Sequence, residues 1–229
     1  MSPHNNRKSA VSHFRSGLIA GLALLVLGAS PAVRAQSDES DEARLLRGGG
    51  GDPVAGKEKS FLCQGCHGAD GISFEPIIPK LAGQYGKYVA KQIRDYQSGI
   101  RSHQIMNAMA GAVDDADLAD IGAYFASQRK MRNGTGAVSK LGEQVFLNSD
   151  LPRSRHACVG CHGPNGKGSG PKAAMYPVIG GQHRAYILKQ LYDFRAGYRV
   201  NSPNSIMNIV TRKMTDEEIE AVADYVSAQ

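Results

Sequence analysis

The chain has 229 residues, of which 41% are hydrophobic and 21% charged, and it contains no tryptophan. Its formal net charge of +6 comes largely from the first 35 residues, which hold four basic residues and no acidic one. Without them, 23 basic residues stand against 21 acidic ones, and this near balance argues against a nucleic-acid-binding protein.

Residues 1–35 have the pattern of a secretory signal peptide. Arg7, Lys8 and Arg15 precede an apolar run at residues 17–29, and small residues follow as far as a cleavage position after Ala35. The run is shorter than the roughly 20 residues of a membrane-spanning helix, although an uncleaved N-terminal anchor is the alternative. We therefore expect an exported, periplasmic protein.

Residues 36–51 contain an acidic stretch and four consecutive glycines, and we expect them to be disordered. The first helix is predicted to follow at once, because Asp52 and Pro53 suit the N-cap and the first helical position. Two further helices are predicted before residue 131 from apolar stripes at helical spacing. These stripes consist of Val89, Ile93, Tyr96 and Ile100, and of Leu118, Ile121 and Phe125.

The second half of the chain repeats the first. Residues 79–101 match residues 177–199 with an offset of 98, and residues 106–128 match residues 207–229 with an offset of 101. The corresponding stripes are Ile187, Leu191, Phe194 and Tyr198, and Ile219, Val222 and Val226, the last helix beginning at a Thr215–Glu218 capping box.

A polar, glycine-containing linker at residues 132–139 separates the two copies. We therefore predict an all-α protein with two tandem domains, at residues 52–131 and 140–229. No segment has the pattern of a strand.

Each half contains one C-x-x-C-H segment, CQGCH at residues 63–67 and CVGCH at residues 158–162. Such segments occur in disulfide redox pairs, in zinc sites and where haem is covalently attached. A thioredoxin-type pair comes with a βαβ pattern, which this sequence lacks. A four-cysteine zinc site needs two pairs at finger spacing, whereas 92 residues separate Cys66 from Cys158. The motif therefore indicates two attachment sites for c-type haem.

Haem attachment explains every residue of the motif. The two thiols form thioethers with the porphyrin, and the adjacent imidazole becomes the proximal ligand of the iron. A domain of about 80–100 residues has a limited core of its own, and a large flat apolar cofactor supplies the missing centre. We predict two covalent haem c groups, held by Cys63, Cys66 and His67, and by Cys158, Cys161 and His162.

The sixth ligand of each iron decides between electron transfer and catalysis. Met106 and Met207 occupy equivalent positions in the two copies, each in a segment expected to form a loop over the opposite haem face. They are the one pair that is methionine in both copies, since the partner of Met109 is Val210. A thioether suits iron and raises its reduction potential, so we predict these two methionines as the distal ligands.

The remaining histidines His103, His156 and His183 have no histidine counterpart, and we expect them at the surface. Each proximal histidine is expected to donate its second ring N–H to a backbone carbonyl. Pro76 lies at a suitable distance in the first copy, and the equivalent position in the second is Ala174.

With these residues in place, the sequence resembles the cytochrome c4 family, exported dihaem proteins built of two class-I-like cytochrome c domains. The resemblance covers residues 52–229 and includes the P-x-[LI]-x-G-Q segments at residues 79–84 and 177–182 and a lengthened stretch before the second haem site. It implies two domains related by a pseudo-twofold axis, with haem edges facing across the interface. It also implies electron transport in the periplasm, typically toward a terminal oxidase and often with loose membrane association.

The expected function is electron transport, with no catalytic residue and no small-molecule substrate. The expected partners are redox proteins: an upstream quinol-oxidising complex or dehydrogenase, and a downstream oxidase of a respiratory chain. Two alternatives remain open. One is a dihaem subunit of a larger dehydrogenase complex. The other is a dihaem peroxidase or thiosulfate-oxidising enzyme, against which a methionine ligand in both domains argues.

Overall fold

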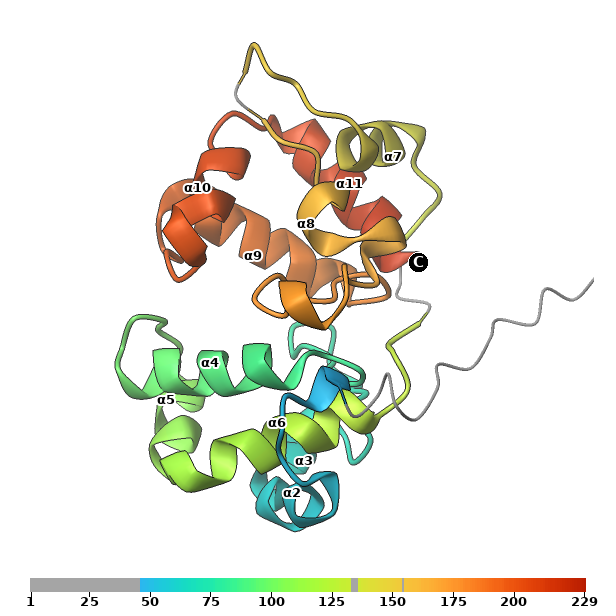
Figure 1. Cartoon of the computed structure of the whole chain (residues 1–229). Helices are drawn as coiled ribbons and strands as arrows, with labels where there is room; N and C mark the ends of the chain where they lie inside the picture. Colours follow the sequence, from blue (N-terminus) through green and yellow to red (C-terminus); the bar gives the residue numbers. More distant parts are fainter. Residues whose placement is uncertain (1–45, 133–135, 154) are drawn as a thin grey trace, which may run out of the picture. The chain divides into compact units, whose positions relative to one another are not determined.

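The computed structural model describes residues 46–132, 136–153 and 155–229, which are helical throughout both repeats (Figure 1). The signal peptide predicted at residues 1–35 lies outside the described residues. Within them there is no strand, only an isolated bridge between Asp150 and Arg155, so the all-α prediction is confirmed. None of the described helices is long and apolar enough to cross a membrane.

The first repeat contains α2 (Pro53–Lys59), α3 (Phe61–His67), α4 (Gly86–Gln97), α5 (Gln104–Gly111), η1 (Asp115–Asp117) and α6 (Leu118–Ser127). The second contains α7 (Lys140–Leu147), α8 (Val159–His162), η2 (Pro164–Gly166), η3 (Pro171–Ala173), α9 (Arg184–Ala196), η4 (Pro203–Ser205), α10 (Ile206–Thr211) and α11 (Asp216–Ser227). Helices α2 and α4 pack on α6, and in the same way α7 and α9 pack on α11. The apolar stripes predicted for α6 and α11 are buried in these contacts.

The helix starts follow the predicted signals. The Asp52 carboxylate accepts a hydrogen bond from the Val54 N–H at 2.8 Å, and Pro53 occupies the first position of α2. Thr215 and Glu218 form the predicted capping box of α11. Such caps satisfy backbone N–H groups that have no partner inside the helix.

The two long middle helices end earlier than their apolar stripes suggest. Helix α4 ends at Gln97 and α9 ends at Ala196, because Gly99 and Gly197 turn the chain with φ of 74° and 80°. Ile100 is consequently 57% exposed and Tyr198 is 84% exposed. These two members of the predicted apolar stripes therefore lie outside the core.

The end of the segment expected to be disordered packs against α6. Arg47 is buried and donates a hydrogen bond to the Gln128 carbonyl at 3.4 Å. A Cβ atom at Gly51 would lie 2.1 Å from the Ala119 carbonyl oxygen, so only glycine permits this approach. The expectation of disorder is therefore wrong for residues 46–51, because the glycine run serves close packing against a helix.

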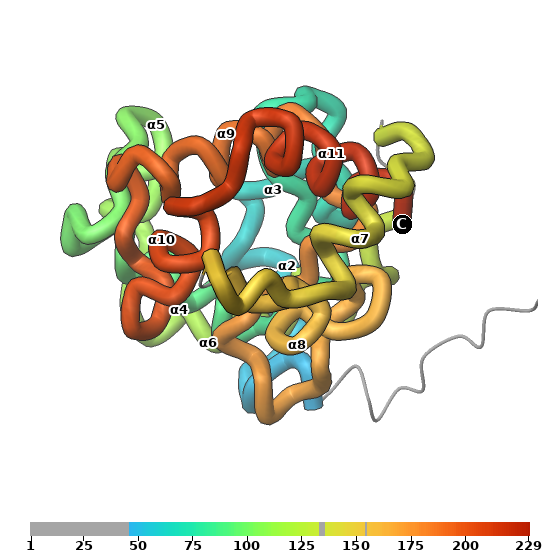
Figure 2. The backbone as a smooth tube through the Cα atoms, turned by 90° about the horizontal axis from the view of Figure 1, so that it is seen from above, coloured from blue at the N-terminus to red at the C-terminus, as the bar shows by residue number. Residues whose placement is uncertain are grey.

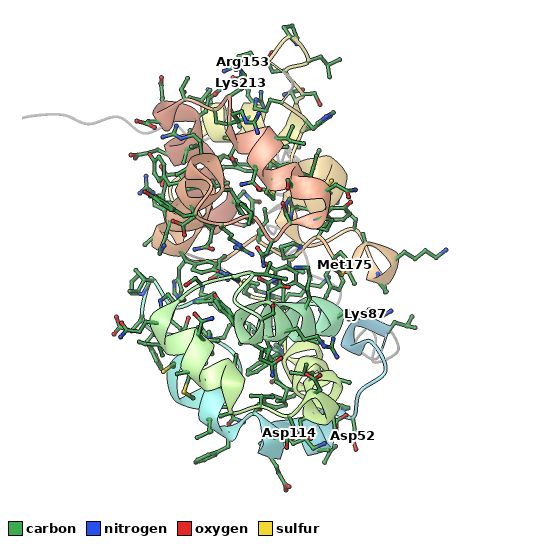
Figure 3. The ribbon with its side chains drawn as sticks, turned by 90° about the vertical axis from the view of Figure 1, so that its left-hand side faces the viewer. Asp52, Lys87, Asp114, Arg153, Met175 and Lys213 are labelled. Carbon is green, nitrogen blue, oxygen red and sulfur yellow. The ribbon has the colours of Figure 1, made fainter. Side chains whose placement is uncertain are left out.

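The lengthened stretch before the second C-x-x-C-H segment is anchored by arginines. Figure 3 shows Arg153 beside Lys213, and the Arg153 guanidinium donates to both carboxylate oxygens of Glu218, at 2.6 and 3.1 Å. The Arg155 guanidinium donates to the carbonyls of Val145 and Asn148, both at 2.9 Å. These bonds connect the stretch to α7 and α11.

The two repeats meet through a reciprocal pair of glutamines. Seen from above, the backbone of the second repeat lies over that of the first (Figure 2). Gln84 donates to the Val178 carbonyl at 2.8 Å and accepts from the Val178 N–H at 2.9 Å. Gln182 makes the same two bonds, each of 2.9 Å, with the backbone of Lys80. The offset of 98 converts one pair into the other, so the interface is pseudo-twofold and the P-x-[LI]-x-G-Q segments form it.

We expect Gln84→Ala to lower the free energy of unfolding by about 2 kcal/mol. The substitution leaves the buried Val178 N–H and carbonyl without partners, and each such group costs about 1–3 kcal/mol. Urea unfolding of the haem-loaded protein measures the change, with exposed Gln144→Ala on α7 as the control. Equal stability of both variants would show that water replaces the lost bonds.

Candidate functional site

The two C-x-x-C-H segments end short helices, α3 and α8. Gly68 and Gly163 follow the histidines with φ of 85° and 75° and turn the chain sharply away. A Cβ atom at Gly68 would lie 2.3 Å from the Ile72 carbonyl oxygen, and one at Gly163 would lie 2.1 Å from that of Gly168. These glycines therefore fix the loop that closes behind each histidine.

Both histidines are buried and held in one orientation. The Nδ1 atom of His67 donates to the Pro79 carbonyl, and that of His162 donates to the Pro177 carbonyl, each at 2.8 Å. Burial lowers the pKa of both imidazoles, although the proline carbonyls act in the opposite direction. A neutral imidazole with Nδ1 engaged leaves Nε2 as the atom available to a metal.

The carbonyl acceptors lie three residues beyond the predicted ones, at Pro79 and Pro177 instead of Pro76 and Ala174. The reason is a turn that draws this segment back toward the motif. In the first repeat the Leu81 and Ala82 N–H groups donate to the Gly71 carbonyl, at 2.7 and 3.0 Å. The second repeat has the same turn around the Gly166 carbonyl.

The chemistry of the cysteines does not fit a thiol redox pair or a zinc site. All four are unpaired. Burial raises the pKa of the Cys63 thiol and raises that of Cys158 to about 11, whereas redox-active pairs depend on a lowered pKa. In residues 46–132, 136–153 and 155–229 no group of three or more His, Cys, Asp or Glu side chains is placed to hold a metal ion.

A cavity of about 890 Å³ brings the predicted residues together. Its walls contain all four cysteines, His67, His162, Met106 and Met207. Most of the remaining lining is apolar, and α4 and α6 in the first repeat and α9 and α11 in the second contribute part of it. Two large apolar groups, one attached at each cysteine pair, fit this lining.

Met106 and Met207 lie on the short helices α5 and α10, not in loops as predicted. The Met106 N–H donates to Nδ1 of His103 at 3.3 Å, and the Met207 N–H donates to Ser202 Oγ at 3.2 Å. The His103 bond caps α5 and explains the difference there, because capping lets a short helix form where the sequence alone suggested a loop.

An asparagine follows each methionine and ties its helix to the preceding long helix. Asn107 donates to the Tyr96 carbonyl at 2.6 Å, and Asn208 donates to the Phe194 carbonyl at 2.7 Å. Sequence reasoning missed this pair, although the repeated Met-Asn dipeptide was its signal.

Two buried arginines lie where the repeats meet, at the ends of α4 and α9. Arg101 donates to Gln92, Tyr186 and Gln190 at 2.6, 3.0 and 2.9 Å. Its counterpart Arg199 bonds the side chains of Gln190, Tyr88, Gln92 and Asn201, at 2.7 to 3.1 Å. Within the described residues, both guanidiniums thus donate hydrogen bonds to neutral side chains. Both arginines line the cavity.

This cluster is electropositive. Burial acts to raise the pKa of Tyr186, but the guanidinium groups of Arg101 and Arg199 together bring it below its ordinary value. Buried cations without an acidic partner are costly unless an anion compensates them. The carboxylates of a haem group suit that position, so the polar part of the cavity fits the cofactor as well as the apolar part does.

His183 is buried between the repeats, which contradicts the prediction of a surface position; His103 and His156 are exposed. Its Nε2 donates to the Ser73 carbonyl at 3.0 Å, and its buried Nδ1 has no hydrogen-bond partner among the described residues. Tyr85 occupies the equivalent position of the first repeat and accepts from the Gly170 N–H at 2.9 Å. The comparison of like residues missed this pair, because the two copies use different side chains.

We expect His183 to make the protein less stable at acidic pH. Burial lowers its pKa, and Lys80 acts in the same direction while the Ser73 carbonyl opposes it. The neutral form is thus favoured by folding. Stability is complete above the unfolded pKa of about 6.5 and falls as pH drops toward the folded pKa, by at most about 1.4 kcal/mol per pH unit.

Denaturant unfolding at pH 7.5 and pH 5.0 measures this effect in the haem-loaded protein. His183→Gln keeps a donor for Ser73 and cannot titrate, so its stability should change less between these pH values than that of the unaltered protein. His156→Gln, at an exposed histidine, is the control and should retain the full loss. An unchanged pH dependence in His183→Gln would contradict the prediction.

Known proteins are similar to this chain in sequence and in architecture. The sequence profile named "Cytochrome c" matches residues 54–129 and again residues 139–229. The chain is 42% identical over 179 residues to cytochrome c4 of Pseudomonas aeruginosa, a match covering 77% of this chain and 88% of the relative. It is 34% identical over 212 residues to a protein of Stutzerimonas stutzeri named "Thiosulfate dehydrogenase electron acceptor", covering 90% of this chain and 92% of that one.

A solved structure agrees with these relatives. The crystal structure of reduced recombinant cytochrome c4 from Pseudomonas stutzeri superposes with a TM-score of 0.72 at 41% sequence identity. The match covers 78% of this chain and 98% of that chain. This chain therefore belongs to the cytochrome c4 family and carries two covalently bound haem c groups.

Proposed function

We propose that the protein is a periplasmic electron carrier in which each repeat binds one haem through its own residues. In the first repeat Cys63 and Cys66 form the thioethers, with His67 and Met106 as axial ligands. In the second, Cys158 and Cys161 form them, with His162 and Met207. The observation that carries the proposal is that one cavity collects the same set twice: a cysteine pair, a buried histidine with Nδ1 engaged, and a methionine on a short helix.

A bound haem iron supplies reversible one-electron redox chemistry. The residues of this chain exclude water from the apolar part of the cavity and keep both imidazoles neutral and oriented. A thioether at the sixth position leaves no place for a substrate, so electron transfer through the haem edge is the chemistry this arrangement favours. The arginine cluster between the repeats provides a polar connection between the two halves of the cavity.

For the pathway, we propose an upstream quinol-oxidising complex or dehydrogenase as donor and a terminal oxidase as acceptor. The signal-peptide pattern of residues 1–35 supports the periplasmic location. Transient, charge-steered docking is what such a carrier requires.

A second candidate is a dedicated acceptor for a thiosulfate-oxidising enzyme, either free or as a subunit of it. The relative named "Thiosulfate dehydrogenase electron acceptor" favours it, since that match extends over 90% of this chain. The two candidates share the same haem sites and differ in the protein that supplies the electrons.

The test begins with the exported protein, its haem content per chain and its oxidised and reduced spectra. Two haems per chain are expected, both with the red charge-transfer band of methionine bound to ferric iron. Rapid mixing then measures reduction by quinol-oxidising membranes, by thiosulfate alone, and by thiosulfate with a thiosulfate dehydrogenase.

Each result supports or contradicts one of the candidate functions. Fast reduction by membranes, and reoxidation by oxidase-containing membranes, supports the respiratory carrier. Fast reduction only when thiosulfate dehydrogenase is present supports the dedicated acceptor. Catalytic oxidation of thiosulfate by the protein alone, or a high-spin haem with half of the charge-transfer band, would overturn the carrier role.

A further inference from the structure

Helix α5 carries two methionines that line the haem cavity, Met106 and Met109. They are three residues apart on one helix, so they lie on the same face with Cβ atoms about 5–6 Å apart. Both side chains are partly buried. The equivalent helix α10 presents Met207 and Val210 to the cavity, and therefore only one sulfur.

The two methionines of α5 differ in how firmly they are held. Met106 packs against the buried core cluster of the first repeat, which includes Val89, Ile93 and Phe125. Met109 is not among the residues packed on that cluster, although it borders the same cavity. A methionine side chain has three rotatable bonds and no branch, so a loosely packed one can move its sulfur over several ångströms.

We propose that Met109 is a reserve ligand of the first haem iron, which binds when Met106 leaves it. This inference rests on the proposed function, because it takes Met106 as the resident ligand. In the exchange one iron–sulfur bond breaks and another forms, with no electron or proton transferred. The equivalent helix α10 offers the second haem no such reserve, since Val210 stands where Met109 would be.

His103 is another group on the cavity wall that could bind iron. Its Nδ1 accepts the Met106 N–H at 3.3 Å, so the ring is already engaged as the N-cap of α5. Sulfur and nitrogen ligands differ in the spectrum, because only methionine gives the red charge-transfer band of ferric iron. The test therefore separates Met109 from His103.

Four variants of the haem-loaded protein test the proposal through the intensity of this band per haem. Met106→Ala should keep the full band, whereas Met106→Ala with Met109→Ala should show a twofold loss. Met207→Ala should show a twofold loss by itself. Adding Val210→Met to Met207→Ala supplies the second repeat with the same reserve and should restore the full band.

A twofold loss already in Met106→Ala would overturn the reserve role, and replacement of the band by a bis-histidine spectrum would assign it to His103. A full band in every variant would instead refute Met106 and Met207 as ligands, and thus the proposed function.

If Met106→Ala does not assemble with haem, cyanide binding to the ferric protein decides. Met109→Leu should then accelerate binding to one haem, with Met175→Leu as the control, and an unchanged rate would contradict the proposal.

Discussion

Replacing both Cys63 and Cys66 by serine should reduce the haem content from two groups per chain to one. Serine cannot form the thioethers, so the first half of the cavity loses the group that fills it. Unfilled cavities cost about 24 cal/mol per Å³. Leaving about half of the 890 Å³ empty therefore costs on the order of 10 kcal/mol, comparable with the entire free energy of unfolding of a domain.

The alkaline pyridine assay measures haem per chain, and limited proteolysis shows which repeat has lost its fold. Cleavage should concentrate in the first repeat, while the second keeps its haem and its protease resistance. The matched control is the double substitution of Cys158 and Cys161, which should reverse the pattern. Two haems retained after either double substitution would refute covalent attachment at that pair.

Arg101→Met should lower the reduction potential of at least one haem. The guanidinium is buried among neutral partners, so it would offset the negative charge of haem carboxylates bound beside it. Removing it favours the ferric state, which carries one more positive charge. A hydrogen bond to a charged group contributes about 1.5–3 kcal/mol, which sets an upper limit of roughly 60–130 mV for one electron, because only the part of this energy that differs between the ferric and ferrous states shifts the potential.

Spectroelectrochemical titration measures this shift, with Arg94→Met as the control. Arg94 also lies on α4, but it is exposed, so its removal should change the potentials little. Arg199→Met should act like Arg101→Met, because the offset of 98 relates the two arginines. Potentials equal to those of the control variant would place the haem carboxylates away from the cluster.

Some predictions made from the sequence were wrong, for two reasons. The repeat was used to find residues that are alike in both copies, such as Met106 and Met207, and this comparison misses unlike pairs. His183 was thus expected at the surface, whereas it is buried at the place where the first repeat has Tyr85. Pro79 was missed as a histidine acceptor because its position depends on a turn around the Gly71 carbonyl.

The sequence by itself determined the cofactor motif, the duplication and the helical class, because these depend on local spacing along the chain. One C-x-x-C-H segment and stripes at helical spacing are visible in each copy, and an offset relates the copies. The tertiary structure alone decided how the copies meet. The Gln84–Val178 and Gln182–Lys80 bonds and the arginine cluster join residues about 90 to 110 positions apart. Such contacts follow from packing in three dimensions, which no local pattern records.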